Sequence, residues 1–169
     1  HRARLHDIIA HAFGLDVERV GVWLGRAGEE HVRSFVRDDE VVGGLLEIPM
    51  GQYFGGRSVS TLGVAAVAID AARRGQGLGA RMMVEMLRAA KQRGFAISTL
   101  YPASVTLYRR AGYERAGARF GFRIDPRHIE IAREKEVTLR EVDTTNGLPD
   151  ELRVLYTRSA SRSPGFLDR

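Results

Sequence analysis

The sequence predicts an α/β (α+β) domain, and three patterns carry this prediction. A nearly continuous apolar run at 60–70, STLGVAAVAID, is typical of a strand that is covered on both faces of a sheet. An amphipathic helical pattern follows at 79–93, after a glycine-rich turn. A second apolar run at 95–101, FAISTLY, comes directly after that helix. The 169 residues are enough for one ordinary domain.

The N-terminal third predicts two helices and a hairpin. Apolar residues at helical spacing indicate helices over 3–13 and 16–27. Two strand-like runs, 31–37 and 41–48, flank the turn residues Asp38, Asp39 and Glu40 and indicate a β-hairpin. The following GQYFGGRS, residues 51–58, is expected to be a glycine-rich loop with two aromatic residues at its tip.

The later part of the chain predicts shorter elements. Gly94 ends the amphipathic helix and Pro102 ends the second apolar strand. We then expect a short helix over 103–112, extended segments near 118–124 and 128–140, and a helix around 152–156. We expect no closing strand in the tail, and no strand before the first helix, so both ends look like cuts in a longer protein.

Composition narrows the possible functions. The chain has no cysteine, which excludes disulfides, thiolate catalysis and cysteine metal ligands, and its five histidines show no metal-ligand spacing. No run approaches the roughly 18 apolar residues of a membrane span, and we expect a cytoplasmic protein. The net charge of +5 comes from arginines that are spread along the chain, which favours an arginine-rich solvated surface over nucleic-acid binding.

The glycine-rich turn at 73–79 is the strongest functional signal. A turn between a buried strand and a helix points backbone N–H groups into the space ahead of the helix, where the helix dipole is positive. Arg73 and Arg74 add positive charge there, so the pattern predicts an anion site, most naturally for a pyrophosphate. The turn lacks the lysine of a Walker loop, and its glycine spacing does not match the dinucleotide fingerprint. A purely structural tight turn is the alternative.

Two motifs in this region resemble one enzyme family. The hexapeptide RGQGLG, residues 74–79, resembles motif A of the GNAT acyltransferases, which bind acetyl-CoA. The heptapeptide LYRRAGY, residues 107–113, resembles their later Leu-Tyr-x-x-x-Gly-Phe/Tyr pattern. The resemblance implies the acyl-CoA N-acyltransferase fold, with a mixed central sheet flanked by helices.

Further segments resemble the enhanced-intracellular-survival (Eis-like) branch of that family. These segments are the glycine-rich loop, LYPAS at 100–104, and the tail LYTRSASRSPGFLDR. The resemblance implies a GNAT domain over 1–136, without its first strand, and the truncated start of a second GNAT-like domain over 137–169. It also implies that the full-length protein is a homo-oligomer, since relatives form hexamers.

The resemblance implies an N-acetyltransferase. It would move acetyl from acetyl-CoA to a primary amine of a small molecule or a lysine side chain, by direct attack in a ternary complex, without metal. The alternative is a non-catalytic acyl-CoA-binding module of the same fold. The implied cofactor-binding residues are Val67, Ala68 and Ile69 for the pantetheine, Arg74, Gly75, Gln76, Gly77, Leu78, Gly79 and Ala80 for the pyrophosphate, and Ala103 and Ser104 in the next helix. For Ser104, a helix N-cap is an equal alternative.

Tyr108 is the candidate general acid. A phenol with a pKa near 10 is protonated at neutral pH and can donate to a thiolate leaving group. Its alternative is a core tyrosine, and we assign Tyr113 to packing. The Eis-like branch implies that the general base is the C-terminal carboxylate of the full-length chain. Solvation at the surface is the favoured interpretation of Glu47 and Asp70, and the acids at 29–30 and 38–40 are expected away from the turn.

Overall fold

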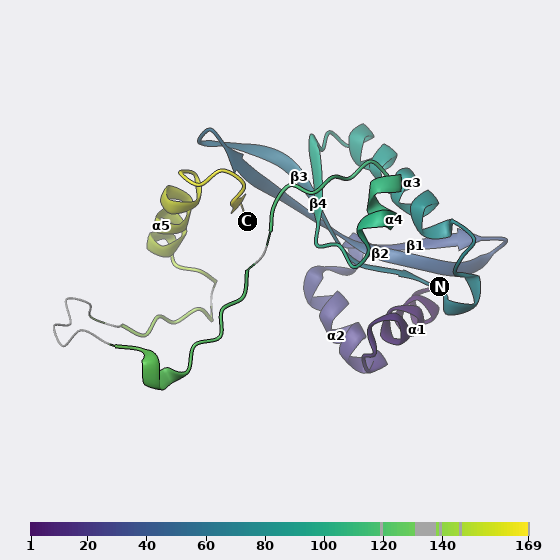
Figure 1. The fold of residues 1–169 in the computed structure, drawn as a ribbon, viewed down its shortest axis with the longest axis horizontal. Coiled ribbons are helices and arrows are strands. Elements are labelled where there is room, and N and C mark those ends of the chain that lie inside the picture. The colour runs from purple at the N-terminus through teal and green to yellow at the C-terminus, as the bar shows by residue number, and fades with distance from the viewer. Residues whose placement is uncertain (119, 131–137, 139, 146, 169) are drawn as a thin grey trace.

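The computed structural model describes residues 1–118, 120–130, 138, 140–145 and 147–168 (Figure 1). The helices are α1 (Arg2–Phe13), α2 (Val17–Ala27), α3 (Leu78–Gln92), α4 (Val105–Arg110) and α5 (Asp150–Ala160). The strands are β1 (Val32–Arg37), β2 (Glu40–Phe54), β3 (Arg57–Ile69), β4 (Ile97–Leu100) and β5 (Leu167–Asp168). Short 3-10 turns are η1 (Glu29–His31), η2 (Ala71–Arg73) and η3 (Pro126–His128).

The predicted α/β fold with a mixed central sheet is confirmed. The strand order is β1-β2-β3-β4. β2 is antiparallel to both β1 and β3, and β4 is parallel to β3. The parallel pair is joined through α3, as the apolar run, glycine turn and amphipathic helix of the sequence predict.

Each face of the sheet is covered by a pair of helices, as Figure 1 shows. The neighbours Leu45 and Leu46 of β2 point to opposite faces, because side chains alternate along a strand. Leu46 joins a core made with α1 and α2, of Leu5, Ile8, Ile9, Val20 and Leu24. Leu45 joins a core made with α3 and α4, of Leu62, Val64, Met82, Met83, Met86 and Tyr108. The apolar face of the predicted amphipathic helix, which carries three methionines, is therefore core.

The expected glycine-rich loop at 51–58 is wrong, because these residues belong to one long hairpin. Antiparallel pairing of β2 with β3 continues to the pair Phe54 and Arg57. The turn is only Gly55 and Gly56, whose φ angles are +55° and +78°. Two glycines with positive φ form the tight turn that matches strand twist, so the aromatic residue before them stays in the strand.

The expectation of a tail without a closing strand is also wrong. β5 pairs antiparallel with β2, with Asp168 opposite Gly51. The amide of Gly165 donates to the carbonyl of Tyr53 at 2.7 Å, and the amide of Tyr53 donates to the carbonyl of Phe166 at 2.8 Å. Figure 1 shows α5 and the chain end beside the far end of the β2–β3 hairpin. α5 is longer than the predicted helix at 152–156.

The remaining expectations concern the segment between α4 and α5. Residues 118 and 120–124 form no strand, contrary to the extended segment predicted there. Most of the second expected segment, 128–140, lies outside the described residues, and so does the predicted domain boundary between residues 136 and 137.

Candidate functional site

The C-terminal end of β3 carries a bulge. Gly44 of β2 pairs with Ala68, whereas Leu46 pairs with Ala65, so Leu45 alone lies opposite two residues of β3. Ala66 has a φ of +52°, a left-handed conformation that costs energy in a residue with a Cβ. Such bulges bend a strand and are common beside active sites.

Beyond the bulge, β3 has a free edge. Parallel pairing with β4 covers only Thr61 to Val64, and the last pair is Val64 with Leu100. Within the described chain, Val67, Ala68 and Ile69 therefore have no strand partner on the β4 side. Their backbone can pair with an extended ligand, in the manner of an added strand.

The glycine turn presents backbone amides that are free. Gly77, with a φ of +74°, is the N-cap of α3 and no side chain caps this helix. Among the hydrogen bonds of the described residues, none is donated by the backbone amides of residues 75–80. An ideal Cβ on Gly75 or Gly77 would meet no atom within 4 Å. The turn is therefore an open cradle of N–H groups at a helix N-terminus, which suits an anion.

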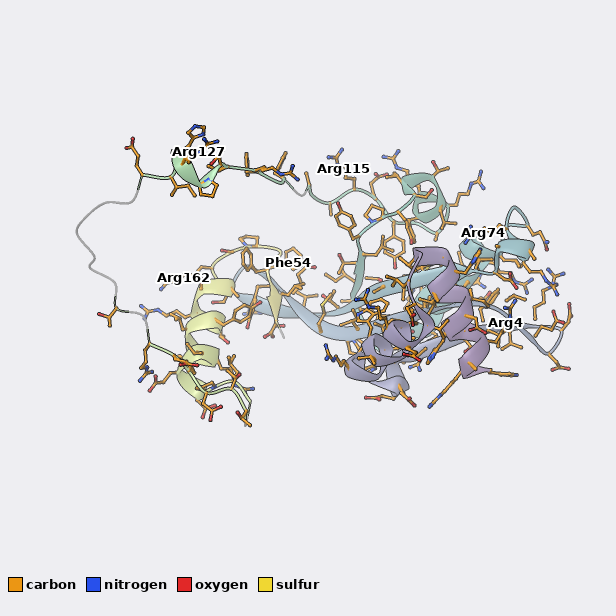
Figure 2. The ribbon with its side chains drawn as sticks, turned by 90° about the horizontal axis from the view of Figure 1, so that it is seen from below. Arg4, Phe54, Arg74, Arg115, Arg127 and Arg162 are labelled. Carbon is orange, nitrogen blue, oxygen red and sulfur yellow. The ribbon has the colours of Figure 1, made fainter. Side chains whose placement is uncertain are left out.

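The two arginines of the turn differ in their partners. The Nε of Arg74 donates to the carbonyl of Ile69 at 3.2 Å and ties the turn to the end of β3. No carboxylate among the described residues pairs with Arg74, whereas Arg73 forms an ion pair with Glu40. The expectation that Glu40 lies away from the turn is wrong, because β2 begins beside the end of β3. Figure 2 shows Arg74 at the opposite end of the domain from Phe54.

Gly79 brings the three parts of the predicted site together. A Cβ added there would lie 3.3 Å from Cδ1 of Leu107 on α4 and 3.7 Å from Cγ1 of Ile69 on β3. The first turn of α3 thus packs closely against both other elements. Tyr108 follows Leu107 directly, so the candidate acid belongs to the same junction.

The N-cap interpretation of Ser104 is confirmed. Its Oγ accepts a hydrogen bond from the amide of Leu107 at 3.4 Å, at the start of α4. Ala103 and Ser104 are both exposed next to the end of β4. Contact of either residue with a cofactor stays a prediction.

Tyr108 is a core residue whose hydroxyl has no hydrogen-bond partner among the described residues. Its side chain is only 6% exposed, and burial raises the pKa of its phenol above the ordinary value. Within the described chain, the proton of Tyr108 is therefore not committed to a partner, unlike that of Tyr113.

The phenolic proton of Tyr113, in contrast, is already used in a hydrogen bond. Its Oη lies 2.6 Å from the Oγ of Ser98, and that Oγ lies 2.9 Å from the carbonyl oxygen of Leu62. The carbonyl can only accept, so Ser98 uses its one proton there and must accept from Tyr113. Burial raises the pKa of the Tyr113 phenol as well. Of the two tyrosines, only Tyr108 can donate to a ligand.

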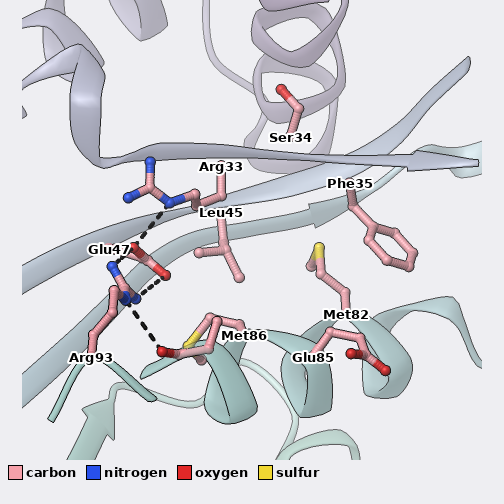
Figure 3. Close-up of a pocket in the computed structure, with 10 residues that line it drawn as sticks. Arg33, Ser34, Phe35, Leu45, Glu47, Met82, Glu85, Met86 and Arg93 are labelled. Carbon is pink, nitrogen blue, oxygen red and sulfur yellow. Dashed lines mark hydrogen bonds and ion pairs between the residues drawn. The ribbon is translucent and has the colours of Figure 1, made fainter. Parts of the chain in front are cut away.

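The sequence interpretation missed a buried ion cluster around Glu47. This side chain is 3% exposed, and Figure 3 shows it between Arg33 and Arg93 beside a pocket of about 370 Å³. The pocket lies between α3 and the strands β1 and β2, with Phe35, Leu45, Met82 and Met86 among its lining. One feature of the sequence could have predicted the burial of Glu47. It lies two residues after the apolar Leu45 in the same strand, so the two side chains share one face of the sheet.

Solvation is therefore the wrong interpretation of Glu47, and Asp70 also has partners. Asp70 forms an ion pair with Arg4, and its Oδ1 accepts from the amide of Ala72 at 3.1 Å at the start of η2. No group of three possible metal ligands occurs among the described residues. None of the helices in the described part of the chain has the length and apolar character needed to cross a membrane.

Comparison with known proteins identifies acetyltransferases as relatives of this chain. A family model described as an acetyltransferase (GNAT) domain matches residues 3–116. A Streptomyces avermitilis protein named as an uncharacterized N-acetyltransferase is 40% identical over 62 residues, which are 37% of this chain and 15% of that protein.

Two solved structures extend the similarity. A GCN5-related N-acetyltransferase from Anabaena variabilis is 31% identical with a TM-score of 0.85, over 98% of this chain and 42% of that one. A GCN5-related N-acetyltransferase from Kribbella flavida is 33% identical with a TM-score of 0.59, over 65% of this chain and 29% of that one. This chain therefore spans less than half the length of each of these three relatives.

Proposed function

The chain belongs to the GNAT family of acetyltransferases, and on this premise we propose that it transfers acetyl from acetyl-CoA to a primary amine of a small molecule or a lysine side chain. The observation that carries the proposal is the row of unpartnered amides at residues 75–80. Phosphate oxygens accept hydrogen bonds from such amides, and the helix dipole favours their charge.

The residues at this end of the domain fit acetyl-CoA in three places. The amides of residues 75–80, together with Arg74, which has no carboxylate partner among the described residues, would hold the pyrophosphate. The free edge of β3 at Val67, Ala68 and Ile69 would hold the pantetheine arm by backbone hydrogen bonds. Ala103 and Ser104, exposed at the start of α4, would flank it.

When bound, acetyl-CoA supplies a thioester that is already activated toward amines. One N–H of the free β3 edge would stabilise the negative charge that develops on the acetyl oxygen. Tyr108 would donate its phenolic proton to the departing sulfur, since its Oη has no partner among the described residues and is protonated at neutral pH.

The general base is not assigned within the described residues. Glu47 does not suit this role, because Arg33 and Arg93 bind both of its carboxylate oxygens. As the Eis-like resemblance implies, we propose that the surplus proton of the amine goes to a C-terminal carboxylate of the full-length protein, directly or through water.

The experiment that tests this function combines binding with turnover in the full-length protein. We expect millimolar CoA to raise the melting temperature, and acetyl-CoA with a panel of amines to release free thiol. No rise in melting temperature would contradict the proposed cradle. Binding without thiol release from any amine would favour the alternative, a non-catalytic acyl-CoA-binding module.

Tyr108→Phe tests the acid directly. We expect the transfer rate to fall by about a hundredfold or more while CoA binding persists, because general acids contribute on that scale. Tyr53→Phe is the matched control, since Tyr53 is also 6% exposed but donates to Asp168 Oδ1 at 3.0 Å in the distant hairpin. A full rate in Tyr108→Phe would remove Tyr108 from the mechanism.

The finer assignments are part of the same proposal. They are membership of the Eis-like branch, the start of a second GNAT-like domain over 137–169, a cytoplasmic location and a homo-oligomer, hexameric in the full-length protein. The resemblance of the tail and the greater length of the three relatives support the second domain. Light scattering of the full-length protein tests the hexamer, and a monomer would contradict it.

A further inference from the structure

Tyr108 lies on a short helix and depends on neighbouring groups for its orientation. α4 has six residues and ends at Arg110, two residues beyond Tyr108. The ring of Tyr113 contacts the ring of Tyr108 edge to face, with 6.0 Å between centroids and 75° between planes. The amide of Tyr113 also donates to the carbonyl of Tyr108 at 3.1 Å. Backbone and ring of Tyr113 thus both hold Tyr108.

Tyr113 is itself fixed to the sheet. Its Oη donates to Ser98 Oγ at 2.6 Å, and Ser98 donates to the carbonyl of Leu62 at 2.9 Å. Leu62 and Ser98 are register partners of the β3–β4 pair, two residues before that pairing stops at Val64 and Leu100. A continuous set of contacts therefore runs from the place where the strands separate to the ring of Tyr108.

We propose that Tyr113 is a positioning residue, which Ser98 anchors to the sheet and whose ring fixes the orientation from which Tyr108 donates its proton. This inference rests on the proposed function. The two tyrosines have different roles in it. Tyr113 keeps its proton in the hydrogen bond to Ser98, whereas the Oη of Tyr108 has no partner among the described residues and can donate.

The proton balance follows from these roles. As the sulfur–carbon bond breaks and the nitrogen–carbon bond forms, Tyr108 gives its phenolic proton to the sulfur. The amine sheds one proton toward the base or water, and water returns one proton to the phenolate of Tyr108. Tyr113 keeps its proton throughout.

Three variants of the full-length protein separate the parts of this arrangement. Tyr113→Leu removes the ring, Tyr113→Phe keeps the ring but removes the bond to Ser98, and Ser98→Ala removes the acceptor. An edge-to-face aromatic contact contributes an amount that corresponds to about a two- to tenfold change in rate. We expect kcat to fall by about tenfold in Tyr113→Leu and by a smaller factor in the other two, with KM for acetyl-CoA within twofold.

The decisive readout is a double-mutant comparison. In a Tyr108→Phe background, Tyr113→Leu should cause no further loss of kcat, because there is no phenol left to position. A full additional loss there, or an unchanged kcat in all three single variants, would overturn the inference. If Tyr113→Leu does not fold, Tyr113→Phe and Ser98→Ala carry the same comparison.

The outcomes also separate this inference from the proposed function. If the parent transfers acetyl and Tyr108→Phe is slow, but the Tyr113 and Ser98 variants are as fast as the parent, only the positioning role falls. If the parent releases no thiol with any amine, both proposals fall. If Tyr108→Phe keeps the full rate, acetyl transfer stands, but Tyr108 leaves the mechanism and the positioning role of Tyr113 falls with it. A CoA-induced rise in melting temperature shows in each case that the variant is folded.

Discussion

Arg93 binds the carboxylate of Glu47 at two points, with Nη1 to Oε2 at 2.9 Å and Nη2 to Oε1 at 2.8 Å. Arg93 is the C-cap of α3, and Glu47 lies on β2 with its side chain 3% exposed. Arg33 of β1 adds a third contact, from Nε to Oε2 at 3.0 Å. The pair therefore fixes the C-terminal end of α3 to the sheet, beside the pocket of Figure 3.

Arg93→Ala should lower the free energy of unfolding by about 1–3 kcal/mol, because the buried Glu47 would lose two of its three contacts and keep only that from Arg33. Arg88→Ala is the matched control on the same helix, since Arg88 pairs with Glu85 at 3.0 Å with both side chains more than half exposed. That control should lose less than about 0.5 kcal/mol. Urea denaturation measures both, and equal losses would contradict a stabilising role for the buried pair.

Gly77→Ala should weaken CoA binding as well as folding. Its φ of +74° would cost a side chain about 1 kcal/mol, and the new Cβ would enter the open space before α3. Gly94→Ala is the control at the other end of α3, where φ is +86° and a Cβ also meets no atom within 4 Å. Both variants should melt earlier, but only Gly77→Ala should lose the CoA-induced rise in melting temperature. The same CoA response in both would argue against the turn as the site.

The free energy of unfolding should fall as the pH rises above about 10, the ordinary tyrosine pKa. Burial raises the pKa of Tyr108 and Tyr113 in the folded state, so above that pH the folded chain still binds protons that the unfolded chain has lost. Stability then decreases with pH until the folded phenols ionise. Denaturation at pH 9 and pH 10.5 measures the decrease.

Tyr108→Phe should show a smaller decrease, since it lacks one of the three phenols whose pKa the fold raises, those of Tyr53, Tyr108 and Tyr113. Tyr101→Phe, whose ring is 77% exposed, is the control and should follow the parent. An identical decrease in Tyr108→Phe and the parent would show that burial of Tyr108 does not contribute.

Gly51→Ala should loosen the tail from the hairpin. An added Cβ would lie 2.1 Å from Ser58 Oγ and 2.8 Å from Asp168 Cβ, so one of them has to move. We expect a loss of about 1–3 kcal/mol in unfolding free energy and faster hydrogen exchange of the Gly165 amide, which bonds Tyr53. Gly25→Ala in α2 meets no atom within 4 Å and should instead stabilise the chain by about 0.5–1 kcal/mol. Unchanged exchange at Gly165 would contradict the prediction.

Local patterns in the amino-acid sequence predict most of the elements and their order. Apolar runs, helical spacing and glycine position act over a few residues, so the strand, turn and helix expected over 60–93 and the N-cap at Ser104 could be predicted. The hairpin turn was missed at Gly55 and Gly56, because aromatic residues and glycines together resemble a loop until pairing with β3 is known.

Which polar groups meet depends on the packing of elements that are distant in the chain. Glu47 and Arg93 are 46 residues apart in the sequence, and Tyr53 and Asp168 are 115 apart. Local periodicity therefore predicts neither contact. The bond from Tyr113 to Ser98 and the ring contact of Tyr113 with Tyr108 likewise depend on how the segment around α4 packs against β3 and β4. Periodicity specifies which face of an element is buried, whereas the partner of a polar group is chosen by packing between elements that are distant in the chain.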